Sequence, residues 1–279
     1  MDPIASATVR TALFVPGDRP DRFSSAAASG ADLVILDLED AVSTAAKSVA
    51  RDAVLDSMSA GLRAAVRINA LDAGGRADLA MLTTITRDAA ESLRAVILPK
   101  AESPEDIAEI AHGLPGVGII ALIESAVGIA ACEAIARSPQ VARLAFGALD
   151  FATDLGSSSR TILDFARCQI VVSSRVAGLA APLDSPTPEF RRSEVVHAGA
   201  TSARDLGFGG QLCIHPLQVP IVASAFRPTD DEIAWAQRVV RAQGDNGATQ
   251  VDGAMVDRPV LLRAQAILER AVDPTVASQ

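Results

Sequence analysis

The stretch "VILDLEDAV", residues 34–42, begins as an apolar, β-branched run and ends among three acids, Asp37, Glu39 and Asp40. A continuous apolar run indicates a strand that is covered on both faces, as the strands of parallel sheets are. Carboxylates at the end of such a strand cost free energy unless a cation or a hydrogen-bond donor compensates them. The stretch therefore predicts a buried parallel strand with a polar cluster at its carboxyl end.

Runs of the same kind recur along the chain and alternate with alanine-rich segments of helical period. We expect eight strands, at residues 11–17, 32–39, 64–70, 95–100, 118–125, 143–150, 179–186 and 210–216. Eight strands that are each followed by a helix-length segment predict an α/β fold, a (β/α)8 TIM barrel. A doubly wound sheet has the same alternation, but it usually has fewer strands, and no GxGxxG motif follows the first run.

The C-terminal part exceeds what a barrel needs. Residues 227–244 read as a helix that Thr229 and Glu232 open and Gly244 closes, and a polar loop then leads to a last helix at 258–271. We expect residues 1–225 to form the barrel. Residues 226–279 are expected to form C-terminal helices and a lid or arm, packed on the barrel or on a neighbouring subunit.

Composition narrows the function classes. The 279 residues are 49% hydrophobic and carry a net charge of −9, without a basic stripe, so nucleic acid is not an expected partner. The sequence contains no apolar run of membrane-spanning length and does not begin like a signal peptide, so we expect no membrane association and a cytoplasmic location. Three well-separated cysteines without CxxC spacing indicate reduced thiols.

Polar residues gather at the predicted carboxyl ends of the strands, where barrel enzymes place their chemistry. Most are acids without His or Cys neighbours, a donor set that suits a hard cation, Mg²⁺ before Zn²⁺. Glu124 and Asp150 end consecutive strands and are the candidate metal ligands. Arg67 is the candidate for gripping a carboxylate, and the backbone amides of Gly147 and Ala148 are candidate donors to a substrate oxyanion.

Each of these residues also has a structural interpretation. An acid after a strand is often a helix N-cap, and Arg67 could merely pair with one of the acids. Lys100 could form a Schiff base with a carbonyl substrate, but the surrounding carboxylates favour a protonated lysine that neutralises them or contacts the substrate. His215 is expected to be a hydrogen-bonded structural group rather than a base.

Blocks that span residues 11–271 resemble the citrate lyase β-subunit-like proteins of the HpcH/HpaI aldolase superfamily, whose relatives include malyl-CoA and citramalyl-CoA lyases. The blocks are "LFVPGDRPDRF", "GADLVILDLEDAV", "VRINAL", "LPKAES", "LIESAVGI", "LAFGALDFATDLG", "LGFGGQLCIHPLQV" and "GAMVDRPVLLRA". They occur in the family's order and together are highly specific.

The resemblance implies a barrel that binds Mg²⁺, with Mn²⁺ as a possible substitute, and coenzyme A as part of the substrate. It places Glu124 and Asp150 at the metal, Arg67 at the oxo-acid carboxylate and Asp257 in a lid that enters a neighbour's active site in a homotrimer or a dimer of trimers. It also places Glu39 and Asp40 at metal-bound waters, and Arg19 and Arg22 at the CoA phosphates. Asp37 is left as a structural partner of these groups.

We therefore expect a Mg²⁺-dependent carbon–carbon lyase that splits a citramalyl-, malyl- or citryl-CoA type of thioester into acetyl-CoA and a 2-oxo acid. Arg67 and Asp257 are the expected catalytic residues, with Asp257 as the acid that protonates the acetyl enolate. Asp257 also precedes Arg-Pro and an apolar helical run, as an ordinary N-cap does. The alternatives are a Schiff-base aldolase, a thioester hydrolase, a malate-type synthase and a non-catalytic binding subunit.

Overall fold

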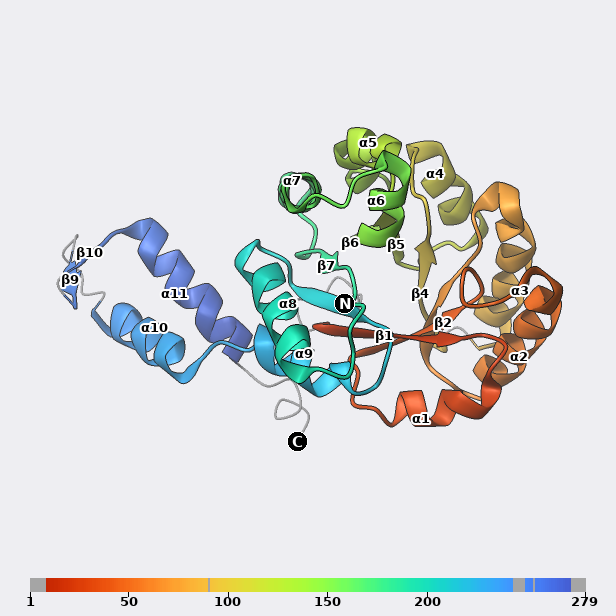
Figure 1. The fold of residues 1–279 in the computed structure, drawn as a ribbon, viewed down its shortest axis with the longest axis horizontal. Coiled ribbons are helices and arrows are strands. Elements are labelled where there is room, and N and C mark those ends of the chain that lie inside the picture. Colours follow the sequence, from red (N-terminus) through yellow and green to blue (C-terminus); the bar gives the residue numbers. More distant parts are fainter. Residues whose placement is uncertain (1–8, 90, 243–248, 253, 272–279) are drawn as a thin grey trace. The chain divides into compact units, whose positions relative to one another are not determined.

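The computed structural model describes residues 9–89, 91–242, 249–252 and 254–271. Its central feature is a closed barrel of eight parallel strands that pair in chain order, with β1 closing on β8 through Thr11 and Gln211. Figure 1 shows the helices arranged around these strands. The strands are β1 Thr11–Pro16, β2 Leu33–Asp37, β3 Ala64–Arg67, β4 Leu93–Leu98, β5 Ile119–Ile123, β6 Val141–Phe146, β7 Leu183–Asp184 and β8 Gly210–Cys213. The predicted TIM barrel is confirmed.

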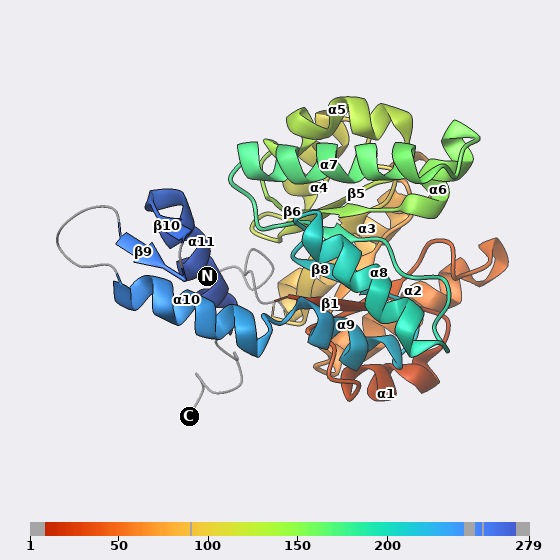
Figure 2. The ribbon, with the colours of Figure 1, turned by 60° about the vertical axis from the view of Figure 1, so that its left-hand side comes forward.

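The helices of the barrel follow the strands, and α5 and α7 pack along each other outside β5 and β6 (Figure 2). They are α1 Phe23–Ala27, α2 Lys47–Ser59, α3 Gly75–Asp88, α4 Pro104–Gly113, α5 Ala126–Ala136, α6 Ala148–Leu155, α7 Arg160–Val176, α8 Ser193–Asp205 and α9 Gln218–Phe226. Short 3₁₀ turns lie at Pro20–Arg22, Thr44–Ala46 and Leu71–Ala73. Helix α4 begins at an N-cap, since Ser103 Oγ accepts a hydrogen bond from the amide of Asp106.

All eight predicted strands run past the observed carboxyl ends, and two of them differ most from the prediction. The segment predicted as 143–150 divides into β6 and the start of α6, so Asp150 lies in the first turn of a helix rather than in a strand. The segment predicted as 179–186 keeps only Leu183–Asp184 as strand, between Pro182 and Pro186. Proline has no N–H to donate to a ladder, which limits how far this strand can pair.

The interior of the barrel is one apolar cluster with members from all eight strands. Successive strand residues point to opposite faces, so this cluster identifies the inward positions of each strand. Its members are Val9, Ala12, Leu33, Ile35, Ala65, Ala95, Ile97, Ile120, Leu122, Ala142, Ala145, Leu183 and Leu212, with Phe14 packed against them. These positions also fix which residues can face the carboxyl-end opening of the barrel, called the mouth below.

The chain divides into two compact units, Met1–Ala223 and Ser224–Gln279. In the second unit, α10 Asp230–Ala242 and α11 Arg258–Ala271 pack through Ala236, Val239, Ala264 and Ile267. Thr229 and Glu232 form the predicted capping box: the amide of Thr229 donates to Glu232 and the amide of Glu232 donates to Thr229. The predicted stop at Gly244 lies outside the described residues.

The segment expected to be a polar loop before the last helix contains two short antiparallel strands, β9 Thr249–Val251 and β10 Ala254–Val256. The last helix, α11, has the predicted bounds. No helix among the described residues combines the length and the apolar character that crossing a bilayer would need.

Candidate active site at the mouth of the barrel

The side chains at the mouth come two residues after inward-facing core residues of the same strands, so they point inward as well. Ile35 leads to Asp37, Ala65 leads to Arg67 and Leu122 leads to Glu124. The same period carries an inward position from Ala145 to Gly147. Three sequence-predicted site residues therefore face one cavity because the strand period that packs the core also aims them.

This mouth cavity has a volume of about 390 Å³, within the range of roughly 300–1,000 Å³ that small-molecule sites occupy. Its polar lining consists of Asp37, Asp40, Arg67, Glu124, Asp150 and Ser185. Its apolar lining consists of Phe14, Pro16, Ala41, Leu122, Leu149, Pro186, Leu212 and Ile214, with Gly147 between them. Arg67 is the only cation in this lining among the described residues.

Arg67 is held by Asp37 through a bidentate ion pair. Nε of Arg67 lies 2.7 Å from Oδ1 of Asp37, and Nη2 lies 2.6 Å from Oδ2. The guanidinium also lies 4.7 Å from the centre of the Phe14 ring, a cation–π distance. Asp37 is itself fixed, because it accepts hydrogen bonds from the amides of Glu39 and Ala41. The Nη1–Nη2 edge of the guanidinium still has an N–H on each nitrogen for a ligand carboxylate.

Glu39 and Asp40 lie on the other side of the same guanidinium. Oε2 of Glu39 is 2.8 Å from Nη1 of Arg67, but the N–H bonds do not point at it, so this buried oxygen has charge contact without a hydrogen bond. Asp40 is exposed, and its Oδ2 is 3.7 Å from Nη1. Nζ of Lys100 lies 3.5 Å from Oε1 of Glu39. Burial raises the pKa of Glu39, although Arg67 opposes the shift.

Glu124 is buried and accepts a hydrogen bond from the backbone amide of Lys100 at 2.8 Å. The pKa of Glu124 is raised to about 8, chiefly by burial and also by the nearby charges of Glu39 and Asp150, while the Lys100 amide and Arg67 oppose the shift. A pKa raised this far means that the protein's own cations do not stabilise the ionised carboxylate of Glu124 sufficiently. A divalent ion beside it would supply that charge.

Asp150 lies in the first turn of α6, close enough to Glu124 to affect its pKa, and both line the mouth cavity. The amide of Gly147 donates to the carbonyl of Ile123, and the amide of Ala148 donates to Oγ of Ser185 at 3.0 Å. Both amides expected to bind a substrate oxyanion are thus engaged within the protein in this structure. Ser185, which sequence reasoning did not select, anchors the start of α6 and so places Asp150.

The donor set fits Mg²⁺. Glu124 and Asp150 supply two carboxylates, the number that this ion commonly takes from protein while water and substrate complete its shell. Within the described ranges no cluster of three or more His, Cys, Asp or Glu side chains is arranged to enclose a metal by itself. The unsatisfied Oε2 of Glu39 and the raised pKa of Glu124 both indicate uncompensated negative charge at this point of the mouth.

The other predicted residues have their own hydrogen-bond and stacking partners. Arg19 is partly exposed at the turn before α1 and forms a two-point pair with Asp21, at 3.0 and 2.9 Å, and Arg22 is exposed in the same turn. Asp257 belongs to the second unit, where it is exposed and its Oδ1 caps α11 by accepting from the amide of Val260. His215 stacks on Phe190 with 4.4 Å between ring centres, and its Nδ1 accepts from the amide of Leu217.

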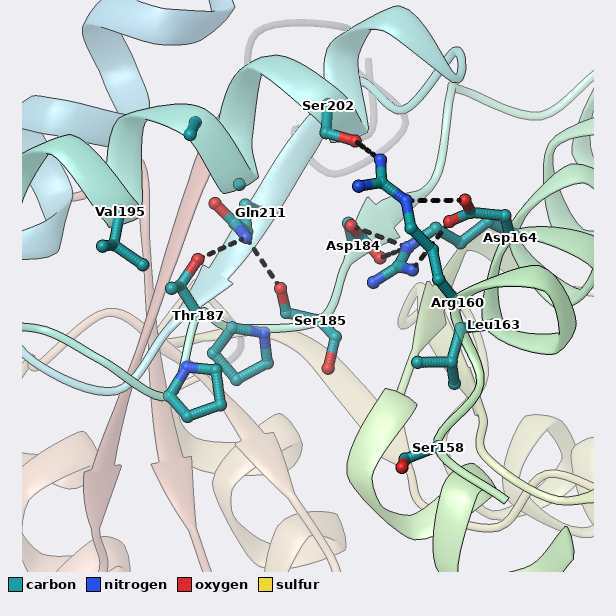
Figure 3. A pocket seen from close by; sticks show the side chains of 15 residues that line it. Ser158, Arg160, Leu163, Asp164, Asp184, Ser185, Thr187, Val195, Ser202 and Gln211 are labelled. Atoms are coloured by element: carbon teal, nitrogen blue, oxygen red, sulfur yellow. Dashed lines mark hydrogen bonds and ion pairs between the residues drawn. The ribbon is translucent and has the colours of Figure 1, made fainter.

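A larger cavity of about 450 Å³, called the outer cavity below, lies outside the strands between α7 and α8. Figure 3 shows Arg160 reaching from α7 toward Asp164 and Ser202, with Asp184 behind it. Arg167 holds Asp184 at 3.0 and 3.1 Å and Asp164 at 3.2 Å. Because its arginines and aspartates pair with one another, the outer cavity is a weaker candidate for chemistry than the mouth, despite its size.

Sequence reasoning missed the apolar wall of the mouth. Phe14, Leu122 and Leu212 form its floor, and Leu149 and Ile214 are exposed beside it. The signal was present, because Phe14 and Leu212 occupy inward strand positions near the carboxyl ends of β1 and β8. A strand-by-strand count of inward positions would have found them.

A closed parallel barrel with carboxylates and an arginine in a cavity at its mouth defines the class of TIM-barrel proteins with an enzyme-like site. The HpcH/HpaI aldolase/citrate lyase family matches residues 10–216, and the chain belongs to this family. A citrate lyase subunit beta-like protein of Mycobacterium tuberculosis is 39% identical over 272 residues, covering 94% of this chain and 96% of the relative.

Two further comparisons bear on the chemistry. A (3S)-malyl-CoA thioesterase of Cereibacter sphaeroides is 30% identical over 275 residues, and 94% of each chain is covered. The crystal structure of CitE from Mycobacterium tuberculosis in complex with magnesium, acetoacetate and coenzyme A matches with a TM-score of 0.82 and 36% identity, over 95% of this chain and 99% of that one.

Proposed function

We propose that this chain is a Mg²⁺-dependent carbon–carbon lyase that cleaves a 3-hydroxyacyl-CoA thioester into acetyl-CoA and a 2-oxo acid. The observation that carries the proposal is the gathering of Glu124, Asp150 and a buried Arg67 in one cavity. Two carboxylates suit a divalent cation, and a guanidinium fork matches the carboxylate of an oxo acid. The magnesium, acetoacetate and coenzyme A bound by the similar CitE structure support the same assignment.

In this proposal the side chains divide the work. Glu124 and Asp150 would hold Mg²⁺, which when bound would polarise the oxygen on the substrate carbon next to the carboxylate. Arg67, fixed by Asp37, binds that carboxylate and orients the bond that breaks. The hydroxyl proton passes to a base, and the electron pair of the carbon–carbon bond moves to the acetyl carbon. An acid then protonates this carbon, and in the reverse direction the same group removes the proton.

Asp257 is our candidate for that acid. Its carboxylate caps α11, so the helix that it opens fixes the direction of the side chain. Glu39 and Asp40 are proposed to hold metal-bound waters. Arg19 and Arg22 are proposed to bind the CoA phosphates, for which Arg19 must exchange its pair with Asp21 for a phosphate.

The apolar wall favours an oxo acid with a small apolar substituent. Beyond the carboxylate that Arg67 binds, the cavity offers Phe14, Leu122 and Leu212 rather than a second cation. A second carboxylate would face these groups and four acids of the lining, which costs free energy. We therefore expect malyl-CoA or citramalyl-CoA to be preferred over citryl-CoA.

A panel assay tests the proposal. Malyl-, citramalyl- and citryl-CoA are supplied with Mg²⁺, and the oxo acid, acetyl-CoA and free CoA are measured separately. A lyase forms oxo acid and acetyl-CoA in equal amounts, and EDTA or Glu124→Ala abolishes both. Full activity of Glu124→Ala would show that the metal assignment is wrong, and absence of oxo acid with every thioester would refute the lyase.

The family-based expectation of a homotrimer with Asp257 acting in a neighbouring subunit belongs to the same proposal. Glu124→Ala and Asp257→Ala chains, each inactive alone, are dissociated, mixed and reassembled. Recovery of activity indicates that the two residues act from different subunits, because only a mixed assembly then contains an intact site. No recovery in an assembly verified as mixed would place Asp257 in its own subunit's site or outside catalysis.

A thioester hydrolase is the second candidate, because the Cereibacter sphaeroides relative is named as a malyl-CoA thioesterase. The same panel distinguishes it, since hydrolysis releases free CoA without an oxo acid. The Schiff-base alternative is disfavoured by the surroundings of Lys100. Burial alone would lower the pKa of Lys100, but Glu39, Asp40 and Glu124 outweigh it and raise the pKa, which keeps the amine protonated and non-nucleophilic.

A further inference from the structure

Lys100 adopts a backbone conformation that is unusual for its residue type. It follows β4 and Pro99, and its φ is +46°, in the left-handed region that favours glycine. A residue with a Cβ and a long side chain pays a conformational cost there, which persists only where the surroundings impose it. The next amide, that of Ala101, already donates to the carbonyl of Leu122 on β5. The amide of Lys100 therefore lies between the end of β4 at Leu98 and this further hydrogen bond to β5.

The amide of Lys100 is directed at Glu124. The N–H of Lys100 donates to Oε1 of Glu124 at 2.8 Å, in the buried floor of the mouth. The side chain of Lys100 does something separate, since it is half exposed and Nζ lies 3.5 Å from Oε1 of Glu39. The backbone and the side chain of one residue thus contact two different carboxylates.

Gly147 confines Glu124 from the opposite side. A Cβ added at Gly147 would overlap Oε2 of Glu124 and would lie 2.6 Å from its Cβ. Its φ is −105°, so glycine is not required here for backbone conformation. Glycine is instead required because it has no side chain, since the Glu124 carboxylate occupies the space that a Cβ would fill.

From these two contacts we propose that Lys100 and Gly147 are positioning residues for Glu124. The left-handed amide of Lys100 fixes Oε1, and the bare Cα of Gly147 leaves room for Oε2, so that the carboxylate is oriented before a cation arrives. This inference rests on the proposed function, because it assigns the orientation a use in divalent-cation binding. It replaces contact with substrate as the main role of both residues.

The test separates the backbone of Lys100 from its charge. Lys100→Met and Lys100→Val both remove the cation, but the β-branched valine resists a positive φ and so withdraws the amide from Glu124. Lys100→Gly removes the same charge and adopts the conformation freely. Mn²⁺ affinity is measured by titration calorimetry on metal-free protein without substrate, together with the melting temperature and circular dichroism of each variant.

We expect Lys100→Gly and Lys100→Met to bind Mn²⁺ within about twofold of each other, and Lys100→Val to bind about tenfold more weakly, as for loss of a supporting contact to a metal ligand. Lys100→Gly should melt about 2–4 °C above Lys100→Met, because glycine relieves the left-handed cost. Gly147→Ala should weaken Mn²⁺ binding by about tenfold or more. Gly113→Ala is its matched control, because a Cβ there meets nothing within 4 Å.

Equal Mn²⁺ affinity of folded Lys100→Val and Lys100→Met would overturn the inference for Lys100 while leaving the proposed function intact. Unchanged affinity of Gly147→Ala would overturn it for Gly147. If the unmodified protein binds no Mn²⁺, the metal-dependent function fails as well, and both are overturned together.

Discussion

The mouth and the outer cavity both contain arginines and carboxylates, but they balance them differently. In the outer cavity Arg160 and Arg167 meet Asp164 and Asp184, and each carboxylate has an arginine partner. At the mouth, Arg67 and Lys100 face five acids, Asp37, Glu39, Asp40, Glu124 and Asp150. Volume alone would select the outer cavity.

The balance of charges instead selects the mouth as the functional site. It also indicates that the ion pairs of the outer cavity contribute to stability, whereas the surplus acids of the mouth contribute to function. A set of ion pairs in which every charge has a partner maintains the folded structure. Removing one partner leaves a buried charge uncompensated and destabilises the fold. A surplus of carboxylates held close together costs the fold free energy, and such a surplus is tolerated where a ligand completes it. The following predictions test this division, from the largest expected effect to the smallest.

Replacing Arg67 by lysine keeps the charge at the mouth but removes the fork that Asp37 holds at two points. We expect kcat/KM for cleavage to fall by about 10³-fold, the size of losing an oriented charged group in a dry site. Steady-state assays with the best thioester of the panel measure it. Arg160→Lys in the outer cavity is the control and should keep full activity. A loss smaller than about tenfold would remove Arg67 from the site.

Replacing Arg167 by methionine should lower stability and leave activity unchanged, in contrast to the expected loss of activity in Arg67→Lys. Asp184 is buried, and burial raises its pKa although Arg167 opposes the shift. The substitution removes the cation that pairs with this buried carboxylate. We expect a loss of about 3 kcal/mol in the free energy of unfolding, with unchanged kcat/KM of the folded fraction. Urea denaturation measures it, and the double variant Arg167→Met with Asp184→Leu should recover most of the loss. Equal stability of the single variant would contradict the structural role.

Metal binding at the mouth should depend on pH through Glu124. Its pKa in the metal-free protein is about 8, raised from 4.5. The stability that this raised pKa contributes is full below pH 4.5 and is lost as pH rises through about 8, so Glu124→Gln should increasingly stabilise the metal-free protein over that window. The ion needs the carboxylate, so Mg²⁺ affinity should instead rise by about tenfold per pH unit up to pH 8.

Calorimetry and thermal melts with and without Mg²⁺ measure these opposite trends. An affinity that stays flat from about pH 6 to pH 8 would mean that Glu124 is already ionised or is not a ligand.

The smallest effect is expected for Arg160→Ala. The side chain is 81% exposed, and its pair with Asp164 follows the i,i+4 spacing on one helix. Such pairs contribute about 0.5 kcal/mol or less, so stability and activity should both stay near those of the unmodified protein. A loss of activity here, measured in the same assay, would show that the outer cavity takes part in the reaction.

Much of the architecture could be predicted from the sequence, because each buried parallel strand has its own apolar run and some helices, such as α4 and α5, begin at a serine that caps them. The capping box at Thr229 and the bounds of α11 depend on such short-range signals. The strand ends were less accessible. Asp150 was expected on a strand and lies in α6, since the apolar run continues through "GALD" without a break and Ser185, distant in sequence, anchors the helix start.

The site was predictable as a set of residue types but not as a set of partners. That Asp37 takes two nitrogens of Arg67 depends on the register between β2 and β3, where the two residues are paired, and one strand's sequence does not contain it. The left-handed conformation of Lys100 has no local signal either, because nothing in "LPKAES" marks the lysine as the residue with positive φ.

Asp37, Arg67 and Glu124 lie on the same inward face of their strands as the core residues. This affects how the chain tolerates changes in length. Deleting one residue from β3 ahead of Arg67 would turn the arginine toward the helices and an aliphatic neighbour toward the mouth, although the amino-acid composition would hardly change. Substitutions at the mouth can alter chemistry one side chain at a time. Single-residue insertions and deletions inside the strands instead exchange the roles of core and site together, so length variation should be confined to the loops.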